Sequence, residues 1–359
     1  MSEQRRWALG VATGTGILGL TVTSGLAFIA NHIVEEFSRP HLVLDESGFT
    51  WTMPQSASDP DPSLQRSLLF KTADGKLLSG DFWAQPCPAP TVVLCHGYRI
   101  SRAHLRSVAT LEYARGYNVL AFDFRGHGGS EGASTSGGNV EVRDLEAALI
   151  VARSQPETLP GRIIIHGFSM GASVALLTPP HPDVCAIIAD SPYARSDEVM
   201  RRLVQYRLLE ASNRWKRWPR LVAQLRSLLP PLAWATVGMS VLVFRLRFGF
   251  TFVARPDASF KRWQGWKTYA QTSDRRRPVP ILLIHAEGDQ LIPIAHARQI
   301  ASQAKIYEVP LETYFVEGGS HCDAYGYNPR QYNSVLKNFL ERQLGPDFPE
   351  QHRNDEGEN

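Results

Sequence analysis

The chain alternates short apolar runs with longer amphipathic segments over most of its length. Six apolar runs have the length of a strand, and segments between them, such as Val140–Arg153 and Ile294–Ala304, have helical periodicity. Strands that are apolar throughout and separated by helices predict an α/β fold, with a parallel sheet covered on both faces. The six predicted strands are Thr91–Cys95, Asn118–Phe122, Arg162–His166, Cys185–Ala189, Val279–His285 and Leu311–Val316.

A hairpin is predicted ahead of this alternation. Leu68–Thr72 and Leu77–Trp83 are apolar runs that flank Ala73-Asp74-Gly75-Lys76, and glycine after aspartate between such runs is typical of a tight turn. The sheet should therefore begin with antiparallel strands and be mostly parallel afterwards. With 359 residues, 43% of them hydrophobic, the chain can bury a full core in one α/β domain that carries an insertion.

The first part of the chain has the pattern of a membrane segment. Trp7–Val34 contains no charged residue and exceeds the ~20 residues that cross a bilayer as a helix. We favour an uncleaved single-pass anchor over a signal peptide cleaved near Gly25-Leu26-Ala27 or a buried helix. Arg5-Arg6 before the segment and Glu35-Glu36 after it favour an N-terminus in the cytoplasm and a main domain outside it.

A basic insertion separates the fourth and fifth predicted strands of the alternation. Ser191–Arg277 contains 18 Arg and Lys against 5 Asp and Glu, so it has a net charge of +13 while the rest of the chain sums to −10. Its run Ser227–Phe244 is uncharged and predicts an interfacial helix or a buried one. Five of the eight tryptophans lie in this insertion: Trp215, Trp218, Trp234, Trp263 and Trp266.

Tryptophan beside arginine is typical of a surface in the lipid headgroup region. We therefore expect the insertion to face a membrane and to admit acyl substrates from it. A protein-docking surface and a nucleic-acid patch are the alternatives. Nothing in the chain resembles a nucleic-acid-binding module, so no nucleic-acid partner is expected.

The candidate nucleophile is Ser169. The strand before it leads into Gly167-Phe168-Ser169-Met170-Gly171, and the helix-compatible run Ala172–Leu177 follows. A serine in a tight strand-to-helix turn has a strained backbone, and glycines two positions before and after it remove side chains that would collide there. The alternative is that Ser169 only caps the helix, which would leave both glycines unexplained.

A base and an acid follow two later strands. His321 ends the glycine-rich loop Glu317–His321, and Asp289 lies in the loop after the strand that ends at His285. The carboxyl ends of parallel strands meet at one edge of a sheet, so these groups should lie near Ser169. A serine hydroxyl needs a neutral imidazole to accept its proton, and a carboxylate to orient that imidazole, which assigns His321 as base and Asp289 as acid.

Other titratable residues are assigned lesser roles. Two acids compete with Asp289: Asp190 follows the strand that ends at Ala189 and would orient the base in a variant layout, and Glu287 is close to Asp289 in the sequence. His166 and His285 lie in strands and are expected to be structural, and His296 lies in a helical pattern.

Acyl transfer also requires donors for the developing oxyanion, and removing one donor typically costs ~2.7 to 4 kcal/mol. The backbone N–H groups of Met170 and Tyr98 are the candidates, although His96-Gly97 before Tyr98 would by itself indicate only a turn. The four cysteines have no metal-ligand spacing, so neither a metal nor an organic cofactor is expected.

Together these residues resemble the α/β-hydrolase superfamily, in its branch of BEM46-like and serine-aminopeptidase-like serine hydrolases. The resemblance spans Leu68–Leu344 and implies an α/β-hydrolase fold, with the loop Asp123–Ser130 as scaffold. Its motifs are His96-Gly97-Tyr98, Asp123-Phe124-Arg125-Gly126-His127-Gly128-Gly129-Ser130, Gly167-Phe168-Ser169-Met170-Gly171, Asp190-Ser191-Pro192-Tyr193-Ala194, Gly288-Asp289 with Ile292-Pro293, and Gly319-Ser320-His321.

The expected protein is a membrane-anchored hydrolase of an ester, thioester or amide with a small acyl or lipid-like group. An aminopeptidase-like enzyme and a non-catalytic anchored scaffold are the alternatives. Its expected segments are a membrane anchor (1–38), a linker (39–66), the first part of the core (67–190), a helical cap insertion (191–277), the second part of the core (278–345) and a polar tail (346–359).

Overall fold

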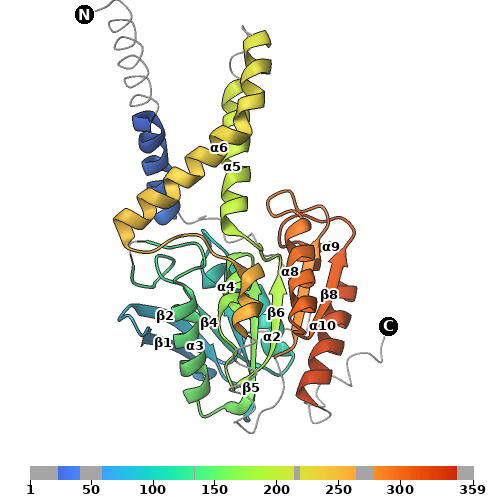
Figure 1. Ribbon diagram of the computed structural model, residues 1–359. Coiled ribbons are helices and arrows are strands. Elements are labelled where there is room, and N and C mark those ends of the chain that lie inside the picture. The colour runs from blue at the N-terminus through green and yellow to red at the C-terminus, as the bar shows by residue number, and fades with distance from the viewer. Residues whose placement is uncertain (1–22, 41–58, 133, 214–218, 264–278, 346–359) are drawn as a thin grey trace, which may run out of the picture. The chain divides into compact units, whose positions relative to one another are not determined.

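The computed structural model describes residues 23–40, 59–132, 134–213, 219–263 and 279–345. The chain forms two compact units (Figure 1). The sheet unit comprises Arg39–Ser196 and Ala254–Asn359, and the helical unit comprises Met1–Ser38 and Asp197–Val253. Most of the predicted anchor, most of the linker and the tail lie outside the described residues.

The sheet unit contains an eight-stranded sheet in the order β1-β2-β4-β3-β5-β6-β7-β8. β2 pairs antiparallel with both β1 and β4, and the remaining neighbours are parallel, which confirms the predicted mostly parallel sheet. The strands are β1 Gln65–Lys71, β2 Leu77–Trp83, β3 Ala89–Cys95, β4 Asn118–Phe122, β5 Thr158–Phe168, β6 Val184–Asp190, β7 Ile281–Ala286 and β8 Leu311–Val316.

Helices cover both faces of this sheet (Figure 1). Alternate residues of β5 point to opposite faces: Ile163 and Ile165 join one apolar cluster with α3, α4 and α8, and Ile164 joins another with α2 and α10. The helices are α2 Arg106–Ala114, α3 Val142–Ser154, α4 Met170–Leu177, α8 Ala295–Ile306, α9 Ala324–Tyr327 and α10 Pro329–Leu344, with short 3-10 turns η2 Pro62–Leu64, η3 Arg102–Leu105 and η4 Pro256–Ala258.

The helical unit consists of α5 Ser196–Asn213, which begins at the last residue of the sheet unit, α6 Pro219–Phe248, and a helix over residues 23–38. All three helices contribute to one apolar cluster, in which the ring of Phe252 lies 5.4 Å from those of Phe37 and Phe244. Among the described residues, one helical stretch, Ser227–Phe248, has the length and composition to cross a membrane. The described end of the predicted anchor is thus helical.

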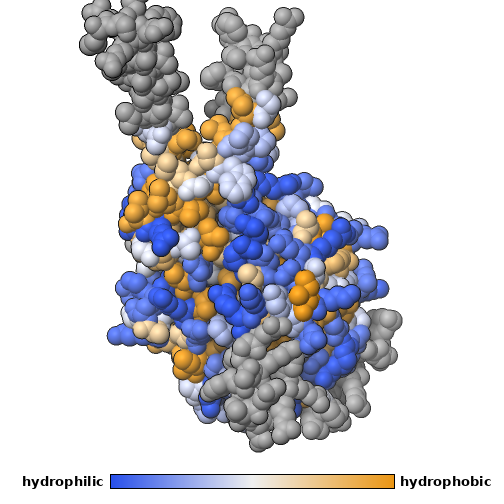
Figure 2. Space-filling view, in the orientation of Figure 1, coloured by the Kyte–Doolittle hydropathy of each residue, from blue (hydrophilic) through white to orange (hydrophobic). Residues whose placement is uncertain are grey.

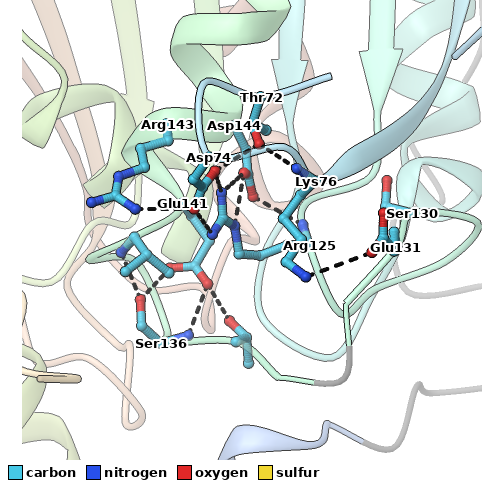
Figure 3. A network of polar contacts seen from close by, with 12 residues as sticks. Thr72, Asp74, Lys76, Arg125, Ser130, Glu131, Ser136, Glu141, Arg143 and Asp144 are labelled. Atoms are coloured by element: carbon cyan, nitrogen blue, oxygen red, sulfur yellow. Dashed lines mark hydrogen bonds and ion pairs between the residues drawn. The ribbon is translucent and has the colours of Figure 1, made fainter. Parts of the chain in front are cut away.

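Arg125 is the centre of a buried ionic network in the sheet unit (Figure 3). Its backbone N–H, Nε and Nη2 donate to the carboxylate of Asp144 on α3, and Nη1 and Nη2 donate to Asp74 in the β1–β2 turn at 2.8 and 2.9 Å. Glu141 accepts from Ser136 and Thr135, which orders the loop before α3. The network therefore joins the hairpin to the main body of the fold.

The Arg125 side chain is 7% exposed and that of Asp144 is fully buried, so Arg125→Ala would leave a buried carboxylate without its partner. Breaking a buried pair in this way costs about 3 to 5 kcal/mol, and we expect that loss in the free energy of unfolding from urea denaturation. Arg143→Ala is the matched control, because Arg143 binds the same Asp74 but is 53% exposed. Its expected loss is below about 1 kcal/mol. Equal losses of unfolding free energy in Arg125→Ala and Arg143→Ala would show that the buried ion pair of Arg125 and Asp144 does not account for the effect.

Candidate active site

Ser169 occupies the turn between β5 and α4. Its φ of 52° lies in the left-handed region that a residue with a side chain rarely adopts. The strained turn is held by two backbone hydrogen bonds: the N–H of Ser169 donates to the carbonyl of Asp190 at 2.8 Å, and its carbonyl accepts from Ser173 at 3.0 Å. The side chain is thereby fixed at the carboxyl end of a central strand.

The two glycines around Ser169 are required by close backbone approach. A Cβ atom at Gly171 would lie 2.1 Å from the carbonyl oxygen of Cys95 at the end of β3. A Cβ atom at Gly167 would lie 2.6 Å from the backbone nitrogen of Ala172. Since real contacts are never this short, any larger residue would force the turn apart, in agreement with the reason given from the sequence.

The structure brings Ser169, His321 and Asp289 into direct contact. Ser169 occupies the N-cap position of α4, but its hydroxyl makes no capping hydrogen bond. Its Oγ lies 2.8 Å from Nε2 of His321, whose Nδ1 lies 2.6 Å from Oδ2 of Asp289. An ionised carboxylate only accepts, so Nδ1 carries the proton in this contact, and Nε2 of the neutral ring accepts from the hydroxyl. The geometry is that of a nucleophile, its base and an orienting acid.

The loop that carries Asp289 packs closely against the loop that carries His321. A Cβ atom at Gly288 would lie 2.3 Å from the carbonyl oxygen of Gly319, and the N–H of Gly288 donates to Gly318. Asp289 is held from its other side, because its Oδ1 accepts from the N–H groups of Leu291 and Ile292 at 2.9 and 2.8 Å. Hydrogen bonds to both of its oxygens therefore fix the orientation of the Asp289 carboxylate.

The environment favours the charged pair of imidazolium and carboxylate. Burial favours the neutral ring of His321, but Cys322 and Asp289 outweigh it and hold the pKa of His321 well above its usual value of 6.5. Burial also raises the pKa of the Cys322 thiol, although its charge interaction and hydrogen bond with His321 lower it. Burial would raise the pKa of Asp289, but its hydrogen bond and charge interaction with His321 lower it.

The side chains of the two competing acids are hydrogen-bonded to other groups. Glu287 binds Arg298 at 2.9 Å on the surface. Asp190 binds the hydroxyls of Ser191 and Tyr332 at 2.8 and 3.2 Å, and burial raises its pKa to about 6.

The three other histidines considered from the sequence, His166, His285 and His296, each have hydrogen-bond partners other than Ser169 and Asp289. His166 contacts Glu112 and Tyr332, His285 contacts the carbonyl of Ile292, and His296 accepts from the N–H of Ala194.

Comparison with models of known protein families identifies the family of this chain. Residues 92–334 match the model described as the alpha/beta hydrolase family. The chain belongs to the alpha/beta hydrolase family. The eight-stranded, mostly parallel sheet flanked by helices is the fold of that family, as the sequence predicted.

The chain is also similar to individual known proteins. YqkD of Bacillus subtilis is 30% identical over 257 residues, which cover 70% of this chain and 71% of YqkD. The thiohydrolase apmlB of Arthrinium phaeospermum is 29% identical over 117 residues, 32% of this chain and 38% of that one. The solved structure of the Pyrococcus furiosus esterase Pf2001 superposes with a TM-score of 0.58 at 26% identity, covering 86% of this chain and 99% of that chain.

The segments expected to supply the oxyanion donors lie beside Ser169. A Cβ atom at Gly97 would lie 3.5 Å from the Cβ atom of Ser169, so the loop that carries Tyr98 passes beside the serine. Met170 is the first residue of α4, where backbone N–H groups have no partner within the helix. Both predicted donors therefore belong to segments next to Ser169.

Ser191 is a supporting residue that the sequence analysis did not single out. It follows β6 with a φ of 56°, accepts from the N–H of Cys322 at 3.2 Å and donates to Asp190. Since Cys322 follows His321, this hydroxyl anchors the base loop to the strand that also binds the Ser169 backbone. The sequence signal for Ser191 was its position next to Asp190, directly after a predicted strand. The motif that contains it, Asp190-Ser191-Pro192-Tyr193-Ala194, served in the sequence only to indicate the family resemblance.

Proposed function

We propose that this protein is a serine hydrolase that cleaves a carboxylic ester, thioester or amide through an acyl-enzyme on Ser169. The single observation that carries the proposal is the continuous contact from Asp289 through His321 to the Ser169 hydroxyl. An ordinary structural serine has no need of an imidazole that is itself oriented by a carboxylate.

In the proposed reaction, Nε2 of His321 accepts the proton of the Ser169 hydroxyl as Oγ attacks the carbonyl carbon. The N–H groups of Tyr98 and Met170 would stabilise the oxyanion, and Asp289 the imidazolium. His321 then donates its proton to the leaving alcohol, thiol or amine, which leaves the acyl group on Oγ. Water attacks that ester with His321 again as base, which releases the acid and restores Ser169. This sequence uses no metal or organic cofactor.

The substrate class is proposed from the relatives. A structural neighbour is an esterase and a partial relative is a thiohydrolase, which favours an ester or thioester. The basic, tryptophan-rich insertion favours a small acyl or lipid-like group in that substrate. We assign the chain to the BEM46-like and serine-aminopeptidase-like branch from its motifs, so a peptidase activity is the second candidate. The scaffold without catalysis is disfavoured, because it has no use for the three contacting side chains.

The proposed location is a membrane. The uncharged run Trp7–Val34 has the length of a single-pass anchor, and the charges beside it favour a catalytic unit outside the cytoplasm.

A fluorophosphonate probe tests the nucleophile, because it reacts with activated serines. Wild-type protein should be labelled, and Ser169→Ala should lose the label because the attacking oxygen is gone. Ser154→Ala is the control, since Ser154 is exposed at the end of α3 and should leave labelling unchanged. Gel fluorescence and mass spectrometry of the labelled peptide measure the outcome. Equal labelling of wild type and Ser169→Ala would remove the assignment.

A further inference from the structure

Helix α6 has an inner face that is buried within the helical unit. Ala233, Val237, Ser240 and Phe244 recur at intervals of three or four residues and are almost completely buried. Three of them join Met200 of α5 in the apolar cluster of this unit. Such a stripe is the usual core-facing side of a helix, and the opposite side would ordinarily be polar.

The opposite face of α6 is apolar as well, and it is exposed. Leu228, Trp234, Leu242 and Leu246 have exposed fractions of 56%, 64%, 50% and 77%. Only 28% of the most apolar window of this helix is buried, and Ser227–Phe244 contains no charged residue. Figure 2 shows hydrophobic side chains along α6. A helix that is apolar on all sides and buried on only one side requires an apolar partner on the other.

The charges around this face indicate the chemistry of the partner. Arg226 precedes the uncharged run and Arg245 and Arg247 follow it, so cations stand at both ends. The guanidinium of Arg201 stacks on the exposed ring of Trp234 at 4.7 Å. Arginine and tryptophan together suit a headgroup region, where the ring is anchored and the cation meets phosphate. A second copy of this basic surface would instead bring like charges together.

The helix beside α6 determines how deeply the unit can enter lipid. α5 packs on α6 but carries six charged residues among its 18, at 197, 198, 201, 202, 207 and 210. Immersing α5 in hydrocarbon would cost several kcal/mol for each such group. A position in the plane of the interface, with only the outer face of α6 in contact with acyl chains, avoids this cost.

We propose that the outer face of α6, formed by Leu228, Trp234, Leu242 and Leu246, lies in the interfacial region of an anionic lipid bilayer. This contact is made by residues other than those of the N-terminal anchor, whose described end packs in the same helical unit. It does not depend on the proposed catalytic activity.

The test measures the surroundings of single positions in the full chain. The background carries Ser169→Ala, which prevents turnover of lipid, and Cys87→Ser, which removes the exposed thiol. An environment-sensitive fluorophore is attached at Leu246→Cys or, as a second site, Leu228→Cys. Ile150→Cys is the matched control, because Ile150 is an exposed aliphatic residue on α3 of the sheet unit. The parent without an added cysteine corrects for labelling of the remaining thiols.

The protein is reconstituted in vesicles of phosphatidylcholine and phosphatidylglycerol. We expect lipids with brominated acyl chains to quench the fluorophore at 246 and 228 but not at 150, and aqueous iodide to quench 150 several-fold more strongly. Anchoring by the N-terminal segment alone would keep the protein on the vesicle without producing this difference. Iodide quenching at 246 and 228 equal to that at 150 would overturn the proposal. Protection from iodide without quenching by brominated lipid would also overturn it and would indicate a protein partner.

Discussion

His321→Ala is expected to lower the rate of ester hydrolysis by about a millionfold, the loss typical for removal of the base from a serine triad. Without the imidazole at 2.8 Å, the hydroxyl of Ser169 keeps its proton and is a poor nucleophile. Residual turnover from the oxyanion donors should remain. Single-turnover hydrolysis of an activated short-chain ester measures the effect.

The control for this variant is His181→Ala. His181 lies beyond α4, contacts Asp183 and is one quarter exposed, so its removal should leave hydrolysis almost unchanged. Thermal unfolding of both variants shows whether either loss comes from the fold. A folded His321→Ala protein that hydrolyses the ester at the wild-type rate would show that another group is the base.

Asp289→Asn is expected to lower hydrolysis by about ten-thousandfold, because the amide no longer fixes the tautomer in which Nε2 accepts the serine proton. It should also change the dependence on pH. The pKa of His321 lies well above 6.5, and the base works only when neutral, so wild-type activity should fall as the pH decreases through that raised value. Asp289→Asn removes a negative charge that raises the pKa of His321, so the pKa of His321 should fall and the acid limb of the variant should move to lower pH.

The rate profile of kcat/KM against pH measures both effects of Asp289→Asn. Glu287→Gln is the matched control, because it removes a carboxylate two residues away that binds Arg298 on the surface. Its profile should follow that of the wild type. An acid limb that stays in place in Asp289→Asn would mean that the carboxylate does not stabilise the imidazolium.

Most of the parallel strands were predictable because they are apolar runs bounded by polar residues, although β8 contains the exposed Glu312 and Thr313. The start of β5 was not, because Thr158–Gly161 contains proline and glycine and extends the strand only by pairing Thr158 with Ala89 on β3. Composition also could not say which tryptophans of the insertion face outward. Trp234 is exposed, whereas Trp263 is buried against Phe260 within the sheet unit. Packing decides such cases, and it depends on residues distant in the sequence.

The candidate site was predictable to the extent that topology determines it. Ser169, Asp289 and His321 each follow a parallel strand, so their meeting at one edge follows from the strand pattern. The Asp190-Ser191 pair marks the end of a strand, but the sequence does not show what the Ser191 hydroxyl contacts. Its contact with the loop after β8 depends on the lateral order of β6, β7 and β8 in the sheet.

The close approach of Gly288 and Gly319 couples the loop that carries Asp289 to the loop that carries His321, so a change in one loop requires a matching change in the other. A graft that replaces only one of them from a relative would introduce side chains or a loop length that the other cannot accommodate. Laboratory evolution toward new substrates should therefore exchange both loops as a cassette, or leave both untouched and diversify segments that do not meet at this junction.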